Sequence, residues 1–412
     1  MKHKAIKLSG DKSLSHRALM LSSIARGKSK IENLCDGLDV RSTINCLRLC
    51  GASIQKRDQV YYINSENLSY PSKHLNCGNS GTTIRLLAGL LAGQGISATL
   101  YGDRSLMSRP MNRVIEPLIK MGANIVYQNN KISIKKAKIF GGKIINETSS
   151  AQVKSAIIMA ALGSTNKTKL CEINDSRDHT EIMIEYLSNN CLRKIGRNII
   201  IKPTIIRSRN FIIPGDISKA SFLIGYSCLS NQSQITFKNL LVNPLRMGFI
   251  CALKRMGADI SVINKFRLNG ELIGDVIVNP SKKLKNIQIS SEEVVKMIDE
   301  VPILAIVASF SSGVMEINGI SELKLKESNR VNAIIHNLNE MGVIALEEED
   351  KIVIKGKKKL YNTSIKTFSD HRIAMSFYIA SLFSFGRASF DDLDCIDISF
   401  PSFFKKLKEI EL

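Results

Sequence analysis

The chain lacks the features that mark membrane proteins, secreted disulfide-rich proteins and many RNA-binding modules. It has no run of 18 apolar residues, and its start, "MKHKAIKLSGDKS", lacks the apolar stretch of a signal peptide. Its nine cysteines include no C-x-x-C pair, and their odd number and wide spacing argue against a disulfide framework and a zinc site. It has no tryptophan and only 6% aromatic residues, which leaves few stacking platforms for RNA bases. We therefore expect a cytoplasmic protein with reduced thiols.

Several familiar catalytic motifs are also missing. Gly27-Lys28-Ser29 lacks the first glycine of a phosphate-binding P-loop, because Ser22 stands at that position. "GQGISA" (93–98) matches a dinucleotide-binding pattern but follows a helical run and leads into a strand-like one, the reverse of the required order. No H-E-x-x-H or G-x-S-x-G sequence is present, so the motifs do not support a metal mechanism or a nucleophilic serine.

Positive charge, in contrast, is plentiful. The chain has 58 Lys and Arg against 37 Asp and Glu, a formal net charge of +21. Such an excess suggests an anionic partner, either nucleic acid or small phosphorylated and carboxylated substrates. A general bias toward lysine, isoleucine and asparagine would give the same total, so the placement of individual arginines is more informative.

One pattern recurs along the chain: leucine, two residues, an apolar residue, glycine and a strand-like run. The glycines are 51, 122, 196, 257 and 342, and a sixth copy starts at "LKEI" (407–410). Each copy predicts the last turn of a helix, closed by a glycine at positive φ and followed by strands. The glycines are 61 to 85 residues apart, so each repeat has room for two helices and several strands. They predict an α/β fold of two pseudo-symmetric domains with three repeats each.

The domain boundary is predicted from chain breakers. A chain of 412 residues is too long for one ordinary core. Pro214-Gly215 is a breaker pair, and Asp216 or Ser218 could cap the helix that follows. We expect a first domain at 11–214 and a second at 1–10 plus 215–412, so that the chain crosses between them near residues 10–11 and 214–215.

Polar clusters stand at the starts of many predicted helices. Helix N-termini that present hydroxyl, amide, lysine and arginine groups bind anions. Ser13 and Arg17, for example, are one helical turn apart, and Arg109 precedes Pro110, which we place at the first position of a helix. Each cluster alone is ordinary, but their accumulation indicates small substrates with two or three negative charges. The clusters are "SGDKSLSHR" (9–17), "CGNSGTTIR" (77–85), "GDRSLMSRP" (102–110), "ETSSAQVK" (147–154), "NDSRDHTE" (174–181), "IDEVP" (298–302), "LKESNR" (325–330) and "SDHRIAM" (369–375).

Taken in order, these segments resemble the EPSP synthase (3-phosphoshikimate 1-carboxyvinyltransferase) family over nearly the whole chain. The resemblance implies two domains of three βαβαββ units each, an inside-out α/β barrel arrangement, with the active site in the cleft between them. It implies transfer of the enolpyruvyl group of phosphoenolpyruvate to the 5-hydroxyl of shikimate-3-phosphate, with release of phosphate and without a cofactor or metal. It also implies small-molecule substrates, no nucleic acid or membrane partner, and a monomer.

The resemblance assigns site residues position by position. Shikimate-3-phosphate would contact Lys12, Ser13, Arg17, Ser150, Gln152, Ser176, Asp299 and Lys326. Phosphoenolpyruvate would contact Lys12, Asn79, Gly81, Arg109, Gln152, Arg330 and Arg372, with Arg85 shaping the pocket. Asp299 would accept the hydroxyl proton, Glu327 would help to protonate the methylene carbon, and Lys12 would assist catalysis. Asp370 is expected to cap a helix and His371 to hold a structural hydrogen bond.

The chain departs from the family pattern at three places. Ile398 stands where some relatives have a lysine that contacts phosphoenolpyruvate, and Lys405 lies too far along to replace it. Leu86 stands where many relatives have proline, and His179 where some have tyrosine, so that Arg177 could share that contact. We expect Glu300, a neighbour of Asp299, to be a surface or hinge residue.

Two alternatives use the same features. A transferase that acts on UDP-N-acetylglucosamine uses the same donor, but the loop before Arg109 has no cysteine, which that enzyme typically has there. An RNA-binding protein on a similar scaffold is compatible with the net charge and is disfavoured by the scarcity of aromatic residues.

Overall fold

The computed structural model describes residues 4–65, 68–188, 190–230, 232–281, 283–357 and 359–411. Its contacts divide the chain into two units. The first unit comprises residues 10–213 and 267–271, and the second comprises the described parts of 1–9, 214–266 and 272–412. Nothing in the sequence indicates that the short piece 267–271 belongs to the first unit. Within the described ranges, no helix is both long and apolar enough to cross a membrane.

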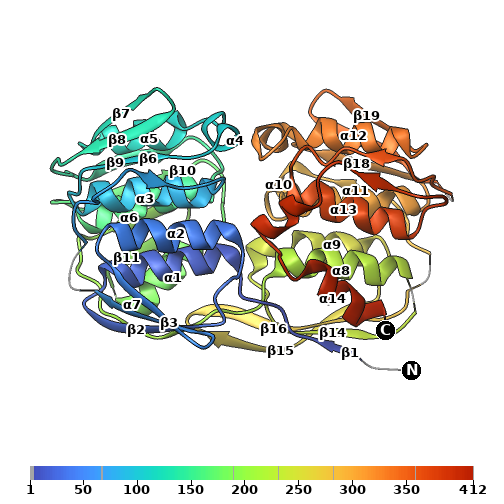
Figure 1. Ribbon diagram of the computed structural model, residues 1–412, viewed down its shortest axis with the longest axis horizontal. Helices are drawn as coiled ribbons and strands as arrows, with labels where there is room; N and C mark the ends of the chain where they lie inside the picture. Colours follow the sequence, from blue (N-terminus) through green and yellow to red (C-terminus); the bar gives the residue numbers. More distant parts are fainter. Residues whose placement is uncertain are drawn as a thin grey trace. The chain divides into compact units, whose positions relative to one another are not determined.

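The first unit contains three repeats that each combine two parallel strands, helices and an antiparallel hairpin (Figure 1). Their sheets have the orders β13-β2-β4-β3, β5-β6-β8-β7 and β9-β10-β12-β11. The elements are α1 (Lys12–Ile24), β2 (Gly27–Glu32), α2 (Leu38–Leu49), β3 (Ser53–Arg57), β4 (Val60–Ser65), β5 (Leu75–Asn76), α3 (Gly81–Gly93), β6 (Ala98–Tyr101), α4 (Arg104–Met107), α5 (Asn112–Lys120), β7 (Asn124–Gln128), β8 (Lys131–Lys135), β9 (Gly142–Asn146), α6 (Ala151–Leu162), β10 (Thr168–Glu172), α7 (His179–Leu187), β11 (Leu192–Ile195), β12 (Asn198–Ile201) and β13 (Phe211–Ile212).

Two repeats of the second unit follow this plan, with sheets in the orders β1-β14-β16-β15 and β17-β18-β20-β19, whereas the sheet of the third has only the parallel pair β21-β22 among the described residues. The tip of the β15–β16 hairpin is the piece assigned to the first unit. The elements are β1 (Lys4–Ile6), α8 (Ile217–Ser230), β14 (Ile235–Leu241), the 3-10 helix η1 (Pro244–Arg246), α9 (Gly248–Arg255), β15 (Ile260–Leu268), β16 (Glu271–Val278), β17 (Gln288–Ile289), α10 (Ser291–Val295), α11 (Val301–Phe310), β18 (Val314–Asn318), η2 (Ser321–Leu325), α12 (Arg330–Glu340), β19 (Ile344–Glu348), β20 (Lys351–Lys355), β21 (Ser364–Ile365), α13 (His371–Leu382), β22 (Ser389–Phe390), η3 (Asp394–Ile398) and α14 (Phe403–Glu411). The predicted α/β class with repeats grouped in two bodies is confirmed.

Two sheets take their outer parallel strand from a distant part of the chain. In the first repeat, β13 pairs with β2, and Phe211 lies opposite Ile31. In the fourth repeat, β1 pairs with β14, and Lys4 lies opposite Ile235. The strand at the beginning of the chain therefore lies in a sheet of the second unit, and the last strand before residue 214 completes a sheet of the first.

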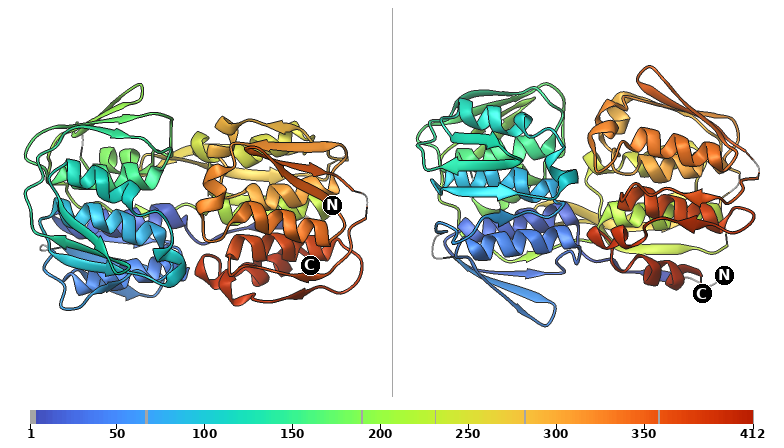
Figure 2. Two further views of the ribbon diagram at one scale, coloured as in Figure 1. Left: turned by 90° about the horizontal axis from the view of Figure 1, so that it is seen from above. Right: turned by 45° about the horizontal axis from the view of Figure 1, so that its top comes forward.

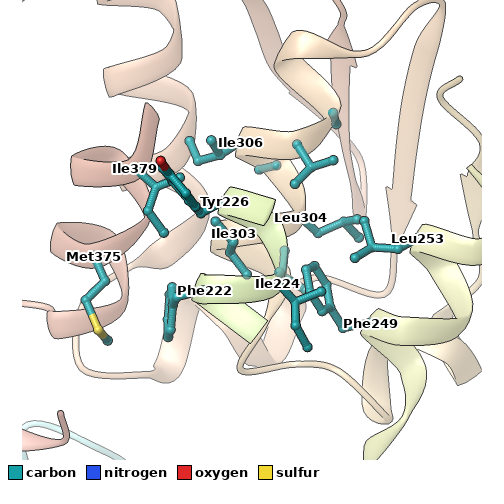
Figure 3. Close-up of a cluster of buried hydrophobic side chains, with 14 of the residues drawn as sticks. Phe222, Ile224, Tyr226, Phe249, Leu253, Ile303, Leu304, Ile306, Met375 and Ile379 are labelled. Atoms are coloured by element: carbon teal, nitrogen blue, oxygen red, sulfur yellow. The ribbon is translucent and has the colours of Figure 1, made fainter. Parts of the chain in front are cut away.

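The core of each unit consists of helices that are buried on nearly all sides, with the sheets along the outside (Figures 1 and 2). In the second unit, side chains of α8, α11 and α13 meet, with Phe222, Ile303 and Met375 among them (Figure 3). In the first unit, α3 and α6 pack closely, because a Cβ on Gly89 would lie only 2.1 Å from the carbonyl oxygen of Ala156. Helices that are apolar all round suit such central positions.

The glycine pattern is correct at four of its five positions. Gly51, Gly122, Gly257 and Gly342 have positive φ and follow α2, α5, α9 and α12. Gly196 also has positive φ, but it lies in the hairpin turn between β11 and β12 and not at a helix end. The prediction was wrong there because a short strand that leads into a glycine turn resembles a last helical turn when only one leucine spacing is considered.

Of two predicted helix starts, the one at Pro110 is wrong and the one at Asp216 is confirmed. Pro110 is not the first residue of a helix, because α5 begins at Asn112 with Met111 as its N-cap. Pro110 instead lies in the connection between the short helix α4 and α5. Asp216 caps α8, since its Oδ1 accepts from the backbone N–H groups of Ser218 at 2.8 Å and Lys219 at 3.3 Å. Ser218 is inside the first turn.

Candidate active site

The start of α1 places Lys12 beside an acidic residue that the sequence had not singled out. Asp11 caps the helix, with its Oδ1 accepting from Leu14 N–H at 2.9 Å. Lys12 Nζ lies 2.9 Å from Asp39 Oδ2, and its side chain remains 16% exposed. Ser13, next along the helix, is half-buried. The first turn of α1 thus holds a partly accessible ammonium group that is already oriented by a carboxylate.

Arg17 connects three helices of the first unit. Its Nε donates to Thr180 Oγ1 at 2.7 Å, and its Nη2 donates to Ser155 Oγ at 2.7 Å. A third bond, from Nη1 to the carbonyl oxygen of Ser13, measures 2.9 Å. Arg17 is buried, so these neutral partners on α1, α6 and α7 fix the direction of its guanidinium.

Two guanidinium groups converge on the beginning of α3. Ser80 caps this helix by accepting from Thr83 N–H at 3.1 Å. A Cβ built on Gly81, the first residue of α3, would lie 3.0 Å from Arg85 Nη1 and 3.3 Å from Arg109 Nη1. A side chain at position 81 would therefore have to displace the ends of both arginines. A helix N-terminus with two cations beside it is a strong anion-binding arrangement.

Neighbouring amides hold these arginines in place. Arg85 Nη1 donates to Gln152 Oε1 at 2.5 Å, and Gln152 Nε2 donates to Thr82 Oγ1 at 2.9 Å. Arg109 Nη2 donates to Asn79 Oδ1 at 2.5 Å, and Asn79 Nδ2 donates to Asp103 Oδ2 at 2.8 Å. The structure therefore brings together four residues that are expected to bind phosphoenolpyruvate: Asn79, Gly81, Arg109 and Gln152.

Ser150 and Ser176 lie at the start of α6 and in the loop before α7. Ser150 caps α6, with its side chain accepting from Val153 N–H at 3.5 Å. Ser176 is buried and its Oγ donates to Glu172 Oε1 at 2.6 Å. Arg177, one residue later, is half-buried.

Sequence reasoning missed the buried ammonium group behind this loop. Lys154 Nζ is completely buried and lies 3.2 Å from Glu172 Oε2 and 2.7 Å from Glu181 Oε1. It also donates to the carbonyl oxygen of Ser176 at 3.0 Å. Burial raises the pKa of Glu181, although Lys154 opposes this effect. In the sequence, Lys154 stands between the polar residues Gln152 and Ser155 of α6, so nothing local marks it as buried.

His179 begins α7 and is fully buried. Its Nδ1 lies 2.6 Å from Glu271 Oε1, a residue of the hairpin tip that belongs to the first unit. The sequence separation of the two residues explains why this pair was not foreseen.

In the second unit, three carboxylates surround one completely buried arginine. Arg330 Nε lies 2.8 Å from Asp370 Oδ2, and Arg330 Nη2 lies 2.5 Å from Glu327 Oε2. The third carboxylate is Asp299, whose Oδ1 lies 3.5 Å from Arg330 Nη1. Asp299 and Glu327 each remain 20% exposed, whereas Asp370 is fully buried. The two acids expected to move protons thus share one cationic neighbour.

Arg372 holds the backbone of Asp299. Its Nη1 donates to the carbonyl oxygen of Asp299 at 3.0 Å, and its Nε lies 3.8 Å from Asp299 Oδ1. Asp370 caps α13 as expected, since its Oδ1 accepts from Arg372 N–H at 2.9 Å. Beyond that role, Asp370 is the most deeply buried partner of Arg330. His371 is buried at the start of the same helix.

The electrostatics of this cluster follow from burial and pairing. Burial opposes ionisation of Asp370, but the Arg330 guanidinium outweighs it, so that the pKa of Asp370 is below its ordinary value. Burial likewise opposes the charge of Arg330, yet Asp370, Glu327 and Asp299 together raise the pKa of this arginine. Both groups are therefore ionised at neutral pH.

A buried histidine, His16, is linked to the start of α3 through two threonines. His16 Nδ1 lies 2.7 Å from Thr43 Oγ1, which in turn lies 2.7 Å from Thr83 Oγ1 near the start of α3. Burial, together with the charges of Lys12 and Arg17, lowers the pKa of His16 well below its ordinary value. The ring is therefore neutral at physiological pH.

The remaining predicted positions differ in their exposure. Lys326 follows the 3-10 helix η2 and is half-buried. Ile398 ends η3 and is half-buried, whereas Lys405 is exposed on α14. Leu86 is fully buried in α3, where proline is not needed to continue the helix.

Glu300 contradicts the expectation of a surface or hinge residue. It is only 1% exposed and is the N-cap residue of α11. Its carboxylate accepts a hydrogen bond from Ser218 Oγ on α8. The sequence "IDEVP" does not distinguish two adjacent acids, and packing against α8 buries the second one.

Comparison with known proteins agrees with these observations. The family model of EPSP synthase (3-phosphoshikimate 1-carboxyvinyltransferase) matches residues 3–407. A 3-phosphoshikimate 1-carboxyvinyltransferase of Petrotoga mobilis is 40% identical, with 98% of this chain and 97% of the relative covered. The protein of the same name from a Thermoanaerobacter species is also 40% identical, with 97% and 96% covered.

Solved structures give the same result for the fold. An EPSP synthase structure from Acinetobacter baumannii matches with a TM-score of 0.87 at 32% identity, covering 98% of this chain and 95% of that one. These matches do not favour the alternative transferase that acts on UDP-N-acetylglucosamine, nor an RNA-binding protein. The chain belongs to the EPSP synthase (3-phosphoshikimate 1-carboxyvinyltransferase) family.

Proposed function

We propose that this chain transfers the enolpyruvyl group of phosphoenolpyruvate to the 5-hydroxyl of shikimate-3-phosphate and releases phosphate, a step toward chorismate and aromatic amino acids. The observation that supports this most strongly is the family match over residues 3–407, which includes every polar cluster described above. The geometry adds convergent cations in the first unit and paired acids in the second. Both are what a reaction between two anions requires.

In this proposal both units act on the same two substrates. Phosphoenolpyruvate, which has a phosphate and a carboxylate, is assigned to Arg109 and its neighbours at the start of α3 and to Arg330 and Arg372. The hydrogen bonds of Arg109 to Asn79 and of Arg85 to Gln152 leave these guanidiniums oriented before the anion arrives. Preorganised cations of this kind stabilise negative charge without reorganisation during the reaction.

Shikimate-3-phosphate is assigned to a second group of residues. Its phosphate and hydroxyls are anionic and polar, and the candidates offer ammonium, guanidinium and hydroxyl donors at the starts of α1, α6 and α7. The assigned residues are Lys12, Ser13, Arg17, Ser150, Gln152, Ser176, Asp299 and Lys326.

The chemistry is an addition followed by an elimination. The 5-hydroxyl oxygen attacks carbon 2 of phosphoenolpyruvate while Asp299 accepts its proton and Glu327 supplies a proton to carbon 3. The tetrahedral adduct then returns a proton from the same methyl carbon as the C–O bond to phosphate breaks. We assign Glu327, whose Oε2 lies 2.5 Å from Arg330 Nη2, and Asp299, whose Oδ1 lies 3.8 Å from Arg372 Nε, to two different atoms of the reaction.

The oligomeric state and the cellular location are also part of the proposal. We propose a monomer in the cytoplasm. All nine cysteines are free, which agrees with a reducing compartment. Light scattering on the protein as it elutes from a size-exclusion column would measure its mass in solution. A mass of twice 45.7 kDa would contradict the monomer.

The test of the function is release of phosphate from the two substrates. The chain should release phosphate only when phosphoenolpyruvate and shikimate-3-phosphate are both present, and mass spectrometry should detect the carboxyvinyl product. UDP-N-acetylglucosamine in place of shikimate-3-phosphate should give no product. Turnover with that acceptor alone would support the alternative transferase.

A further inference from the structure

A buried polar cluster joins the start of α8 to the start of α11 within the second unit. Arg246 Nη2 donates to Ser218 Oγ at 2.7 Å, and Ser218 Oγ donates to Glu300 Oε1. The three residues are only 2%, 4% and 1% exposed. None of them is assigned to a substrate, so the cluster needs another explanation.

Glu300 directly follows Asp299, and the two residues are held by different partners. The carbonyl oxygen of Asp299 accepts from Arg372 Nη1 at 3.0 Å. The side chain of Glu300 is held on α8 through Ser218, on a helix that supplies none of the assigned residues. The backbone that supports the Asp299 carboxylate is therefore fixed on both sides.

The cluster is built to hold one arrangement. A buried carboxylate is costly unless it is hydrogen-bonded and its charge is offset. Ser218 donates a hydrogen bond to Glu300 and accepts one from Arg246, so the positive charge is linked to the carboxylate through this hydroxyl, while Asp216 Oδ1 lies 3.8 Å from Arg246 Nη2. Because Asp216 also caps α8, the position of Glu300 is tied to the end of a core helix.

We propose that Glu300, held by Ser218 and Arg246, is a positioning residue that fixes the direction of the Asp299 carboxylate for proton transfer. This inference rests on the proposed function, in which Asp299 accepts the proton of the 5-hydroxyl. A general base has to lie within hydrogen-bond reach of that proton, and a displacement of about 1 Å can cost about 100-fold in rate. Glu300 does not touch the reacting atoms and acts only through its neighbour.

The experiment compares Ser218→Ala, Glu300→Ala and Glu300→Gln with the unmodified chain. Both alanine variants remove the hydrogen bond, and each should lower kcat by about 10- to 100-fold. The dissociation constants of both substrates, measured by calorimetry, should stay within about twofold, since the binding arginines are unchanged. Glu300→Gln should recover most of the turnover, because its amide oxygen still accepts from Ser218.

Two further readouts separate positioning from general stability. The double variant Ser218→Ala with Glu300→Ala should have the same kcat as Glu300→Ala alone, because both changes break the same Ser218–Glu300 hydrogen bond. The pH dependence of kcat should keep its shape, since the proposed general base is unchanged. Glu340→Gln, an exposed acid at the end of α12, is the matched control and should behave like the unmodified chain.

The outcomes are distinct. Normal kcat in folded Ser218→Ala and Glu300→Ala would overturn the positioning role and leave the proposed function intact. A loss of kcat that is accompanied by an equal loss of substrate binding would also overturn it. If Glu300→Ala does not fold, Ser218→Ala decides alone. No turnover by the unmodified chain would overturn the proposed function and this role together.

Discussion

Replacing Asp370 by asparagine would remove one negative charge from a fully buried cluster while leaving its shape almost unchanged. Asparagine caps helices about as well as aspartate, so α13 should keep its start. The lost term is the attraction to Arg330, whose Nε and Nη2 lie 2.8 and 3.3 Å from the Asp370 oxygens. For charge centres about 4 Å apart and an effective dielectric constant of about 20, that attraction is about 4 kcal/mol.

The net loss should be smaller than this attraction. Glu327 and Asp299 contact the same guanidinium and would still offset its charge. Breaking a buried ion pair by removing one partner costs about 3–5 kcal/mol. We therefore expect Asp370→Asn to lower the free energy of unfolding by about 3 kcal/mol.

Urea unfolding at pH 7 measures this loss as a lower midpoint at an unchanged slope. Asp397→Asn, at an exposed acid in η3, is the control and should change stability by less than about 0.5 kcal/mol. A loss below about 1 kcal/mol for Asp370→Asn would refute the argument that this pair stabilises the second unit.

Acid provides a second check of the same prediction. Because the pKa of Asp370 is lowered in the folded protein, its contribution is complete above the ordinary pKa of about 3.9 and is lost as the pH falls below it. The difference in stability between the unmodified chain and Asp370→Asn should therefore shrink as the pH falls below about 3.9. A difference that stays constant would mean that the charge of Asp370 does not contribute.

Three further predictions concern the assigned residues. Asp299→Asn and Glu327→Gln should each lower turnover by about 10²- to 10⁴-fold in a phosphate-release assay, with substrate binding retained, and full activity in both would exclude them as the proton-transferring acids. Arg109→Ala and Arg372→Ala should each weaken the binding of phosphoenolpyruvate, measured by calorimetry, by about 1.5–3 kcal/mol, and the binding of shikimate-3-phosphate much less. Equal losses of binding for the two substrates would contradict the assignment. Because the folded protein keeps His16 neutral, the unfolded chain binds the extra proton, so urea midpoints of the first unit should fall as the pH drops below about 6.5, and His16→Gln should remove that part of the pH dependence.

The sequence was sufficient to predict the local parts of this fold. Glycines after helices and caps such as Asp216 and Asp370 depend on neighbouring residues, and most of these features appear where they were expected. Gly196 shows the limit of such reasoning, because a hairpin and a helix end can share one short pattern. A local pattern such as this one shows that an element ends at a glycine, but it does not show whether that element is a helix or a strand.

Contacts between distant segments were beyond the reach of the same reasoning. The three carboxylates on Arg330 come from residues 299, 327 and 370, and only packing of α11, α12 and α13 brings them to one guanidinium. Glu300 was misjudged for the same reason, since its burial depends on α8. The pairs Lys12–Asp39 and Lys154–Glu181 likewise depend on tertiary structure and gave no sequence signal that could be assigned.

The exchange of outer strands between distant parts of the chain has a consequence for the order of folding during synthesis. The sheet of the first repeat pairs β2 with β13, so it has an open edge until Phe211 and Ile212 have left the ribosome. β1 is made before the first unit, yet it cannot pair until Ile235–Leu241 exists, and it has to stay available while residues 10–213 are made. Closing such long loops is slow compared with forming local hairpins. A nascent chain stopped between residues 213 and 235 would therefore contain all strands of the three first-unit sheets but still lack residues 267–271 of that unit, and its first strand β1 would be unpaired. That stage is the one most exposed to wrong edge-to-edge pairing.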